Sequence, residues 1–135
     1  MTTLQQLVER HHANTRPADA DSIRTLEQKL SFPLSSEYQS YLAQFGVIAF
    51  GAYETYGLGV PDNSFLNVAN AYADLSRDPG YPANSVPLMD IGDGHYYLYD
   101  NKSQKIVVWA SPNGGIVETL DEGLDAFLKT KIFGE

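Results

Sequence analysis

Two carboxylates and an imidazole lie close together in the sequence, at Asp90, Asp93 and His95, around a pair of glycines. Carboxylate oxygens and imidazole nitrogens both bind divalent cations, so these side chains could form a metal site. Their spacing differs from that of the calcium-binding loop, which needs oxygen donors at its first, third and fifth positions and a glutamate at its end. Asp-Gly is also among the commonest turns of a β-hairpin. The spacing therefore favours a hairpin turn over a metal site.

His11 and His12 form a second pair of side chains that could bind a metal ion. Adjacent residues of a helix point about 100° apart, so a helix does not easily bring both rings to one ion. The sequence has no cysteine and none of the motifs G-x-S-x-G, G-x-x-x-x-G-K-[ST] and H-E-x-x-H. We therefore expect no metal, no cofactor, no catalytic residues and a protein that is not an enzyme.

Tyrosine is unusually frequent, with nine in the chain. Tyr96, Tyr97 and Tyr99 fall on one predicted strand, whose alternation puts Tyr97 and Tyr99 on one face and Tyr96 on the other. A tyrosine beside a carboxylate suits a protein-binding surface, because the ring supplies contact area and the hydroxyl tolerates water. We expect most of these rings in the core and a minority at the surface.

The chain is acidic, with 17 Asp and Glu against 9 Lys and Arg and a formal charge of −8. Such a surface repels nucleic acid, whose binding depends on cationic side chains that face phosphates. A negative field attracts cationic partners and speeds their association. Solubility alone would account for the charge equally well.

Apolar side chains recur with helical spacing in five segments, and short segments rich in β-branched and aromatic residues lie between them. The predicted helices cover residues 4–11, 23–30, 36–45, 65–75 and 120–128. A strand or hairpin is predicted within 47–56, and strands at 86–91, 95–99, 106–109 and 116–118. Residues 13–21 are expected to form a loop. Consecutive short strands without strand–helix alternation are typical of an α+β protein.

Capping side chains predict where some of these helices begin. Asp21 is expected to cap the second helix, and Asn63 or Ser64 the fourth. Thr119 and Glu122 have the spacing of a capping box for the last helix.

A chain of 135 residues fits one domain. Its first 16 residues have no apolar leader, and no stretch approaches the roughly 20 apolar residues of a membrane-spanning helix. We therefore expect a cytoplasmic protein that does not bind membranes.

Two blocks of the sequence resemble the SUKH (Smi/Knr-like) superfamily. The first block begins with I-x-x-L-E-x-x-L at residues 23–30, continues through Pro33 and Leu34, and ends with Y-x-x-Y-L at 38–42 before Gly46. The second is V-P-L at 86–88, followed by I-G-D-G-H-Y-Y-L-Y-D at 91–100. It is similar to the family's strand pair G-[GN]-G-D-x-x-x-[LF]-D, with His95 where an acidic residue is usual.

The resemblance implies an α+β fold with a central antiparallel sheet, flanked by N-terminal helices, an inserted helix and a C-terminal helix. It places a family core at 21–128 of a single domain spanning 1–135, after an N-terminal helix and loop at 1–20. Bacterial members are mostly immunity proteins, which bind and neutralise a cognate polymorphic toxin, often a nuclease. Fungal Knr-type members are regulators that act as interaction hubs. Neither role is catalytic.

The leading hypothesis is an immunity protein that occludes the active site of a basic toxin. We expect its binding surface to combine a central aromatic anchor with surrounding carboxylates. The residues predicted for this surface come from turns and strand ends: Glu54, Tyr56, Asp62, Asp90, Asp93, His95 and Asp100.

Three alternatives remain open at this point. A regulatory or scaffold module of the same fold would bind an endogenous protein. An enzyme or small-ligand binder would use the turn at 90–95. An exposed tyrosine face could also serve a homodimer.

Overall fold

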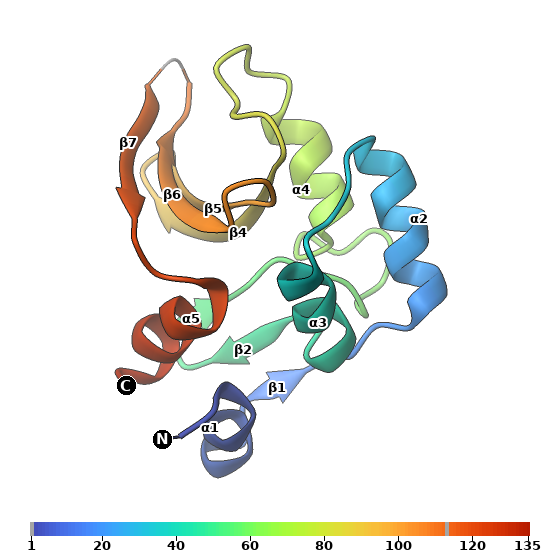
Figure 1. The fold of residues 1–135 in the computed structure, drawn as a ribbon, viewed down its shortest axis with the longest axis vertical. Coiled ribbons are helices and arrows are strands. Elements are labelled where there is room, and N and C mark those ends of the chain that lie inside the picture. The colour runs from blue at the N-terminus through green and yellow to red at the C-terminus, as the bar shows by residue number, and fades with distance from the viewer. Residues whose placement is uncertain (1, 113) are drawn as a thin grey trace.

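The computed structural model describes residues 2–112 and 114–135 (Figure 1). Its helices are α1 (Leu4–His11), α2 (Ala20–Leu30), α3 (Ser36–Gln44), α4 (Val68–Leu75) and α5 (Leu124–Phe133). Its strands are β1 (Asn14–Thr15), β2 (Ile48–Phe50), β3 (Tyr53–Glu54), β4 (Ser85–Gly92), β5 (His95–Asp100), β6 (Lys105–Ala110) and β7 (Gly115–Leu120). The predicted α+β class is confirmed. No helix among these residues is long and apolar enough to cross a membrane.

The strands form two antiparallel sheets. The larger one is a meander in the order β4-β5-β6-β7, and the smaller has the order β1-β2-β3. A backbone hydrogen bond from the amide of Tyr56 to the carbonyl of Leu88 (2.9 Å) joins the segment after β3 to the edge strand β4. Strand β1 lies within the predicted loop 13–21, because Asn14 and Thr15 pair with Ala49 and Ile48, which are distant in sequence.

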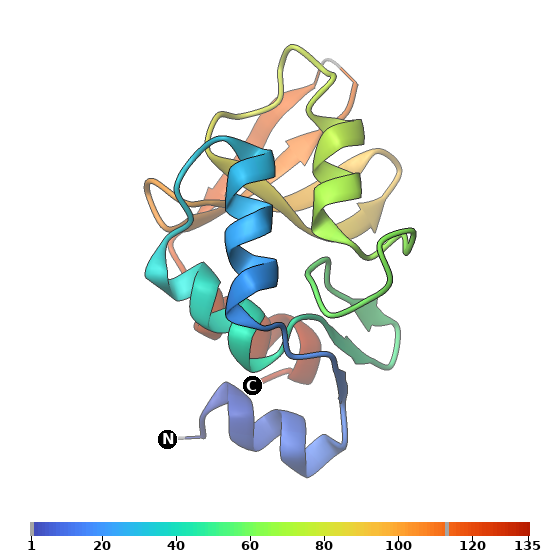
Figure 2. The same ribbon diagram turned by 90° about the vertical axis from the view of Figure 1, so that its right-hand side faces the viewer.

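Two helices pack on the larger sheet, α4 against β4 and α5 against β6. α2 and α4 lie side by side (Figure 2). α1 and α5 pack together at the end of the molecule where both termini lie (Figures 1 and 2). The His11 ring stacks on Phe133, with 5.3 Å between ring centroids. His11 therefore serves in packing between these helices.

The first three helices begin at side-chain caps. Thr3 and Gln6 form a capping box at α1, and Ser35 caps α3. The predicted cap of α2 is wrong, because Asp19 rather than Asp21 accepts the hydrogen bond from the Ser22 amide (2.8 Å). Asp19 has the extended backbone of an N-cap residue, whereas Asp21 already lies inside the helix.

The predicted start of α4 is also wrong. Its cap is Asn67, whose side-chain oxygen accepts a hydrogen bond from the Ala69 amide (3.0 Å). Backbone hydrogen bonds between Gly57 and residues 66 and 68 hold Asn67 in an extended conformation, so the helix begins only after it. Phe65 consequently lies outside the helix, with 71% of its surface exposed.

Helix α5 begins after Gly123 without a side-chain cap, so the predicted capping box is wrong. Thr119 and Leu120 lie in β7 instead, opposite Val107 and Ile106 of β6. Pairing with β6 extends the strand through the residues that would otherwise have capped the helix.

The main core lies between the larger sheet and the helices. It contains a stack of buried tyrosines in which Tyr38 lies between Tyr41 and Tyr99, each ring pair 5.6 Å apart. Tyr97 also packs on this core, while Tyr96 packs on a second cluster around Trp109. The predicted division of the β5 tyrosines between two faces is therefore confirmed.

Two glycines allow the segment after β3 to pack tightly. A Cβ atom on Gly57 would lie 1.6 Å from the carbonyl oxygen of Gly46. On Gly59, which has a φ of +83°, it would lie 1.8 Å from the carbonyl oxygen of Arg16. Only glycine fits this close backbone approach, which fixes the path of the chain from Tyr56 to α4.

Candidate functional site

Two neighbouring hollows open between the end of β3, the segment before α4, and the β4–β5 hairpin. They have volumes of about 330 and 260 Å³. Both are lined by Tyr56 and Phe65, and we call them together the acidic groove. The larger hollow is further lined by Ala52, Glu54, Leu66, Asp90, Ile91 and Gly92. The smaller one is further lined by Asn70, Ala71, Asp74, Leu75 and Tyr96.

A buried threonine positions the β3 side of the groove. Thr55 is fully buried, and its hydroxyl oxygen accepts a hydrogen bond from the Ile48 amide (2.8 Å). The Tyr41 hydroxyl lies 2.5 Å from the Thr55 hydroxyl and donates to the Tyr56 carbonyl (2.9 Å). Since successive side chains alternate along an extended chain, burial of Thr55 directs Glu54 and Tyr56 outward.

The β4–β5 hairpin positions the opposite side. Asp90 is exposed on β4, pairs with Tyr96 of β5, and accepts a hydrogen bond from the Gly92 amide (2.8 Å). This contact orients the carboxylate at the point where the strand enters its turn. In Figure 2 the hairpin, α4 and the segment that follows β3 share one side of the molecule.

Apolar side chains project into the same groove. Phe65 is 71% exposed and Ile91 is 44% exposed, and both line the larger hollow. A single exposed apolar side chain is ordinary on a protein surface. A group of them beside a hollow is instead typical of an interaction site.

The electrostatic environment of the groove is negative. Burial raises the pKa of Tyr56 to about 12, with further contributions from Asp90, Tyr96, Asp74 and Glu54. Burial also raises the pKa of Tyr96, again with contributions from Asp90 and Asp74. The carboxylates are therefore close enough to both rings to oppose a second negative charge.

Little positive charge offsets these carboxylates. Among the described residues that line either hollow, none is lysine, arginine or histidine. Asp74 pairs at 3.9 Å with Arg77, which follows α4, and both side chains are mostly in solvent. Exposed pairs of this kind contribute about 0–1 kcal/mol, so Asp74 remains available to a partner.

Five of the seven predicted residues lie in or beside the acidic groove. Glu54, Tyr56 and Asp90 line it. Asp93 and His95 lie next to it in the β4–β5 turn, where the carbonyl of Asp93 and Nδ1 of His95 are 3.0 Å apart. The preference for a hairpin turn at this position is confirmed. Over the described ranges, no group of three His, Asp or Glu side chains is arranged to hold a metal ion.

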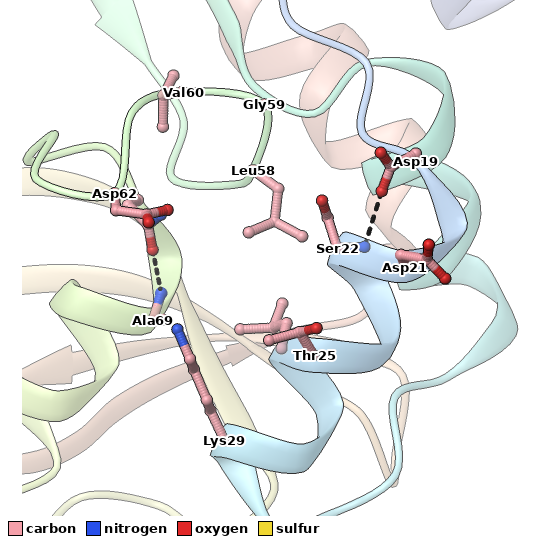
Figure 3. Close-up of a pocket in the computed structure, with 12 residues that line it drawn as sticks. Asp19, Asp21, Ser22, Thr25, Lys29, Leu58, Gly59, Val60, Asp62 and Ala69 are labelled. Carbon is pink, nitrogen blue, oxygen red and sulfur yellow. Dashed lines mark hydrogen bonds between the residues drawn. The ribbon is translucent and has the colours of Figure 1, made fainter.

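The other two predicted residues lie elsewhere. Asp100 is at the far end of β5, where it accepts a hydrogen bond from the Lys102 amide (2.8 Å) and so shapes the next turn. Asp62 lines a separate hollow of about 410 Å³ between α2 and the segment before α4 (Figure 3).

The hollow around Asp62 has mixed polar walls. Asp19, Ser22, Thr25 and Lys29 line it from α2 and its cap (Figure 3). The Asp19 carboxylate is engaged in capping α2, and the hydrogen bonds from Ser22 lower its pKa. The Lys29 ammonium offsets the negative charge here, in contrast to the acidic groove.

Among the groove residues that the sequence did not predict, three are exposed side chains of the type that binds a partner: Phe65, Asp74 and Ile91. Phe65 has the spacing of an apolar residue of the following helix, which predicted a core position for it. Asp74 lies on the exposed side of α4 among ordinary solvent-facing residues. Ile91 follows the alternation of β4 only until the register shifts between Asp90 and Gly92. This register shift arises from the pairing of β4 with β5, so the sequence of β4 alone does not reveal it.

The SMI1-KNR4 cell-wall family model matches residues 20–128, which is most of the chain. The chain belongs to this family. A crystal structure of a protein from Pseudomonas syringae pv. tomato has the same fold, with a TM-score of 0.78 and 14% sequence identity. The match covers 97% of this chain and 99% of that one. A search of curated proteins finds no match.

Membership in the SMI1-KNR4 family confirms the resemblance that residues 23–46 and 86–100 indicated. It is consistent with an immunity-type role based on binding another protein. The acidic groove lies within the matched region, since its lining residues fall between 52 and 96.

Proposed function

We propose that this SMI1-KNR4 family protein is a non-catalytic immunity protein that binds and neutralises a basic toxin of bacterial origin. The acidic groove is the binding surface, and the toxin's active-site region is the part it covers. The observation that carries the proposal is one groove in which exposed Phe65 and half-buried Tyr56 adjoin three carboxylates without a lining cation.

Both parts of this surface have a physical role in binding. The rings supply apolar area that is lost from water on contact, and such aromatic anchors dominate the affinity of protein interfaces. The carboxylates attract a partner of opposite charge, speed its association and select against acidic proteins. A nuclease fits this description, because its cleft is basic in order to bind phosphates.

Five of the residues predicted from sequence belong to this proposed surface. Glu54, Tyr56 and Asp90 line the groove, and Asp93 and His95 extend it along the hairpin turn. Asp62 and Asp100 would contact the partner only at the periphery. In this proposal the protein works in the cytoplasm as a single domain.

A regulatory module that binds an endogenous protein is the second candidate. The observation that favours it is the description of the matching family, which refers to the cell wall and not to a toxin. The same groove would serve either function, so identifying the partner separates the two.

The test is co-expression with the product of the adjacent gene, followed by co-purification and growth rescue. We expect a stable complex and rescue for the wild type, and loss of both for the double variant Glu54→Lys, Asp90→Lys. Glu118→Lys, an equally exposed carboxylate on β7, is the matched control and should rescue fully. If a folded and toxic neighbour gives no complex and no rescue, it is not the partner, and the regulatory function becomes the better explanation.

A further inference from the structure

We infer that the acidic groove binds two arginine side chains of its partner, one in each hollow, on either side of the Phe65 ring. This inference rests on the proposed function in taking the partner to be a basic protein. It specifies which side chains of that protein carry the recognition.

The division of the groove supports two cations. Glu54 and Asp90 line only the larger hollow, and Asp74 lines only the smaller one. Tyr56 and Phe65 line both. Each hollow therefore has its own carboxylate and shares the same aromatic walls, so a single arginine of the partner would fill only one of them. The solvent-exposed pair that Asp74 forms with Arg77 contributes little, which leaves this carboxylate available to the second arginine.

The aromatic walls favour arginine over lysine. A guanidinium group is planar and weakly hydrated, so it stacks on a ring while its N–H groups donate to a carboxylate. An ammonium group is compact and strongly hydrated, and it loses more hydration free energy when it leaves water. The methylene stem of the side chain can cover the exposed parts of Phe65 and Ile91.

At a neighbouring site, a cation of the chain itself already contacts two tyrosine rings. Lys131 Nζ lies 5.7 Å from the centroid of the Tyr53 ring and 5.4 Å from that of Tyr97. Among the described cation–ring contacts, none involves Tyr56, Phe65 or Tyr96. The rings of the acidic groove therefore have no cation from the described chain, in contrast to the rings beside Lys131.

Blocked tetra-arginine and tetra-lysine peptides test the inference without the natural partner. In an NMR titration of the ¹⁵N-labelled protein, we expect tetra-arginine to shift the amides of Glu54, Tyr56, Phe65 and Asp74. Tetra-lysine should bind about two- to fivefold more weakly, the factor that corresponds to an exposed cation–ring contact of 0.5–1 kcal/mol. Blocked tetra-glutamate should cause no shift.

Three variants separate recognition by the groove from attraction to the whole acidic surface. Phe65→Ala should reduce the preference for tetra-arginine over tetra-lysine. The double variant Glu54→Gln, Asp90→Asn should weaken the binding of both cationic peptides. Glu118→Gln should change neither the preference for tetra-arginine nor the affinity for either peptide. All four side chains are exposed, so the fold should persist, which thermal unfolding checks. Equal affinity for the two peptides, with shifts spread over every acidic segment, would overturn the inference.

The two proposals can fail separately. Growth rescue that survives Phe65→Ala and the Glu54→Gln, Asp90→Asn pair would contradict arginine recognition but leave immunity intact. Selective binding of tetra-arginine in the groove, without any complex with a folded toxic neighbour, would support arginine recognition and count against that immunity function.

Discussion

The buried tyrosine stack and the acidic groove use the same residue type in opposite ways. In the stack, the hydroxyls of Tyr41 and Tyr99 have partners inside the protein, such as the Tyr56 carbonyl and the Glu37 carboxylate, both at 2.9 Å. In the groove, Tyr56 and Tyr96 present their rings to carboxylates across an open hollow. The comparison shows that the surroundings of a tyrosine determine whether it stabilises the fold or is available to a partner.

The two regions are also connected. Tyr41 belongs to the stack, and its hydroxyl holds both Thr55 and the backbone of Tyr56. Changes in the stack should therefore reduce stability and disturb the groove, whereas changes to the exposed side chains of the groove should affect binding alone.

Removing the Tyr41 ring should have the largest effect. Tyr41→Ala leaves a cavity beside Tyr38 and Phe45, and truncation of a buried aromatic ring costs about 3–5 kcal/mol. We expect the free energy of unfolding in urea to fall by this amount. A fall of less than about 1 kcal/mol would mean that the stack does not stabilise the core.

Removing the Phe65 ring should affect binding and not stability. Phe65→Ala should leave the free energy of unfolding within about 0.5 kcal/mol, as is usual for an exposed side chain. It should weaken the complex by about 2 kcal/mol or more if Phe65 is the anchor of the interface. Titration calorimetry measures the affinity, and an unchanged dissociation constant would exclude Phe65 from the interface.

Removing single hydroxyls from the stack gives a finer test. Tyr41→Phe leaves buried Thr55 without one partner and frees the Tyr56 carbonyl, so we expect a loss of about 1.5 kcal/mol in unfolding free energy. Tyr38→Phe is the matched control, because within the described residues the buried Tyr38 hydroxyl has no hydrogen-bond partner. That variant should be neutral or slightly stabilised. Equal losses of unfolding free energy in the two variants would show that the Tyr41 hydrogen bonds do not stabilise the fold.

The smallest effect concerns the ionisation of Tyr56. Its pKa is raised from 10.0 to about 12, so the folded chain holds the proton more tightly than the unfolded chain. The resulting stability is complete below the unfolded pKa and is lost as the pH rises from 10 towards 12. Subtracting the tyrosinate absorbance of Tyr56→Phe from that of the wild type isolates the Tyr56 signal, which should titrate with a pKa near 12. Bound tetra-arginine should lower this pKa. A difference that titrates near 10 would contradict the burial of Tyr56.

Local signals in the sequence predict much of the fold. Apolar spacing at residues 4–11 and 36–45 predicts helices α1 and α3 together with the buried face of each. The meander from β4 to β7 follows from alternating apolar residues separated by turn residues. These features depend on neighbours within a few residues.

Three of the errors arise where distant segments determine local structure. Asn67 caps α4 because its bridge to Gly57 holds it extended, and Thr119 lies in a strand because it pairs with β6. Strand β1 exists because β2 lies beside it. None of these contacts leaves a pattern in the sequence of the segment that it changes.

The candidate site shows the same limit. Glu54, Tyr56 and Asp90 could be predicted because they flank turns of β-rich segments, where side chains reach solvent. That Asp90 and Glu54 share a hollow, while Asp62 and Asp100 lie apart from it, depends on how β3, α4 and the hairpin pack together.

The most direct test of the groove as the partner-binding surface is the affinity of the purified partner for three forms of the protein. We expect the double variant Glu54→Lys, Asp90→Lys to lose at least a hundredfold in affinity, or about 2.7 kcal/mol. Glu118→Lys should bind within about twofold of the wild type, although it changes the charge on an equally open part of the surface. Equal losses for Glu118→Lys and the double variant, or none for either, would contradict the acidic groove as the binding surface.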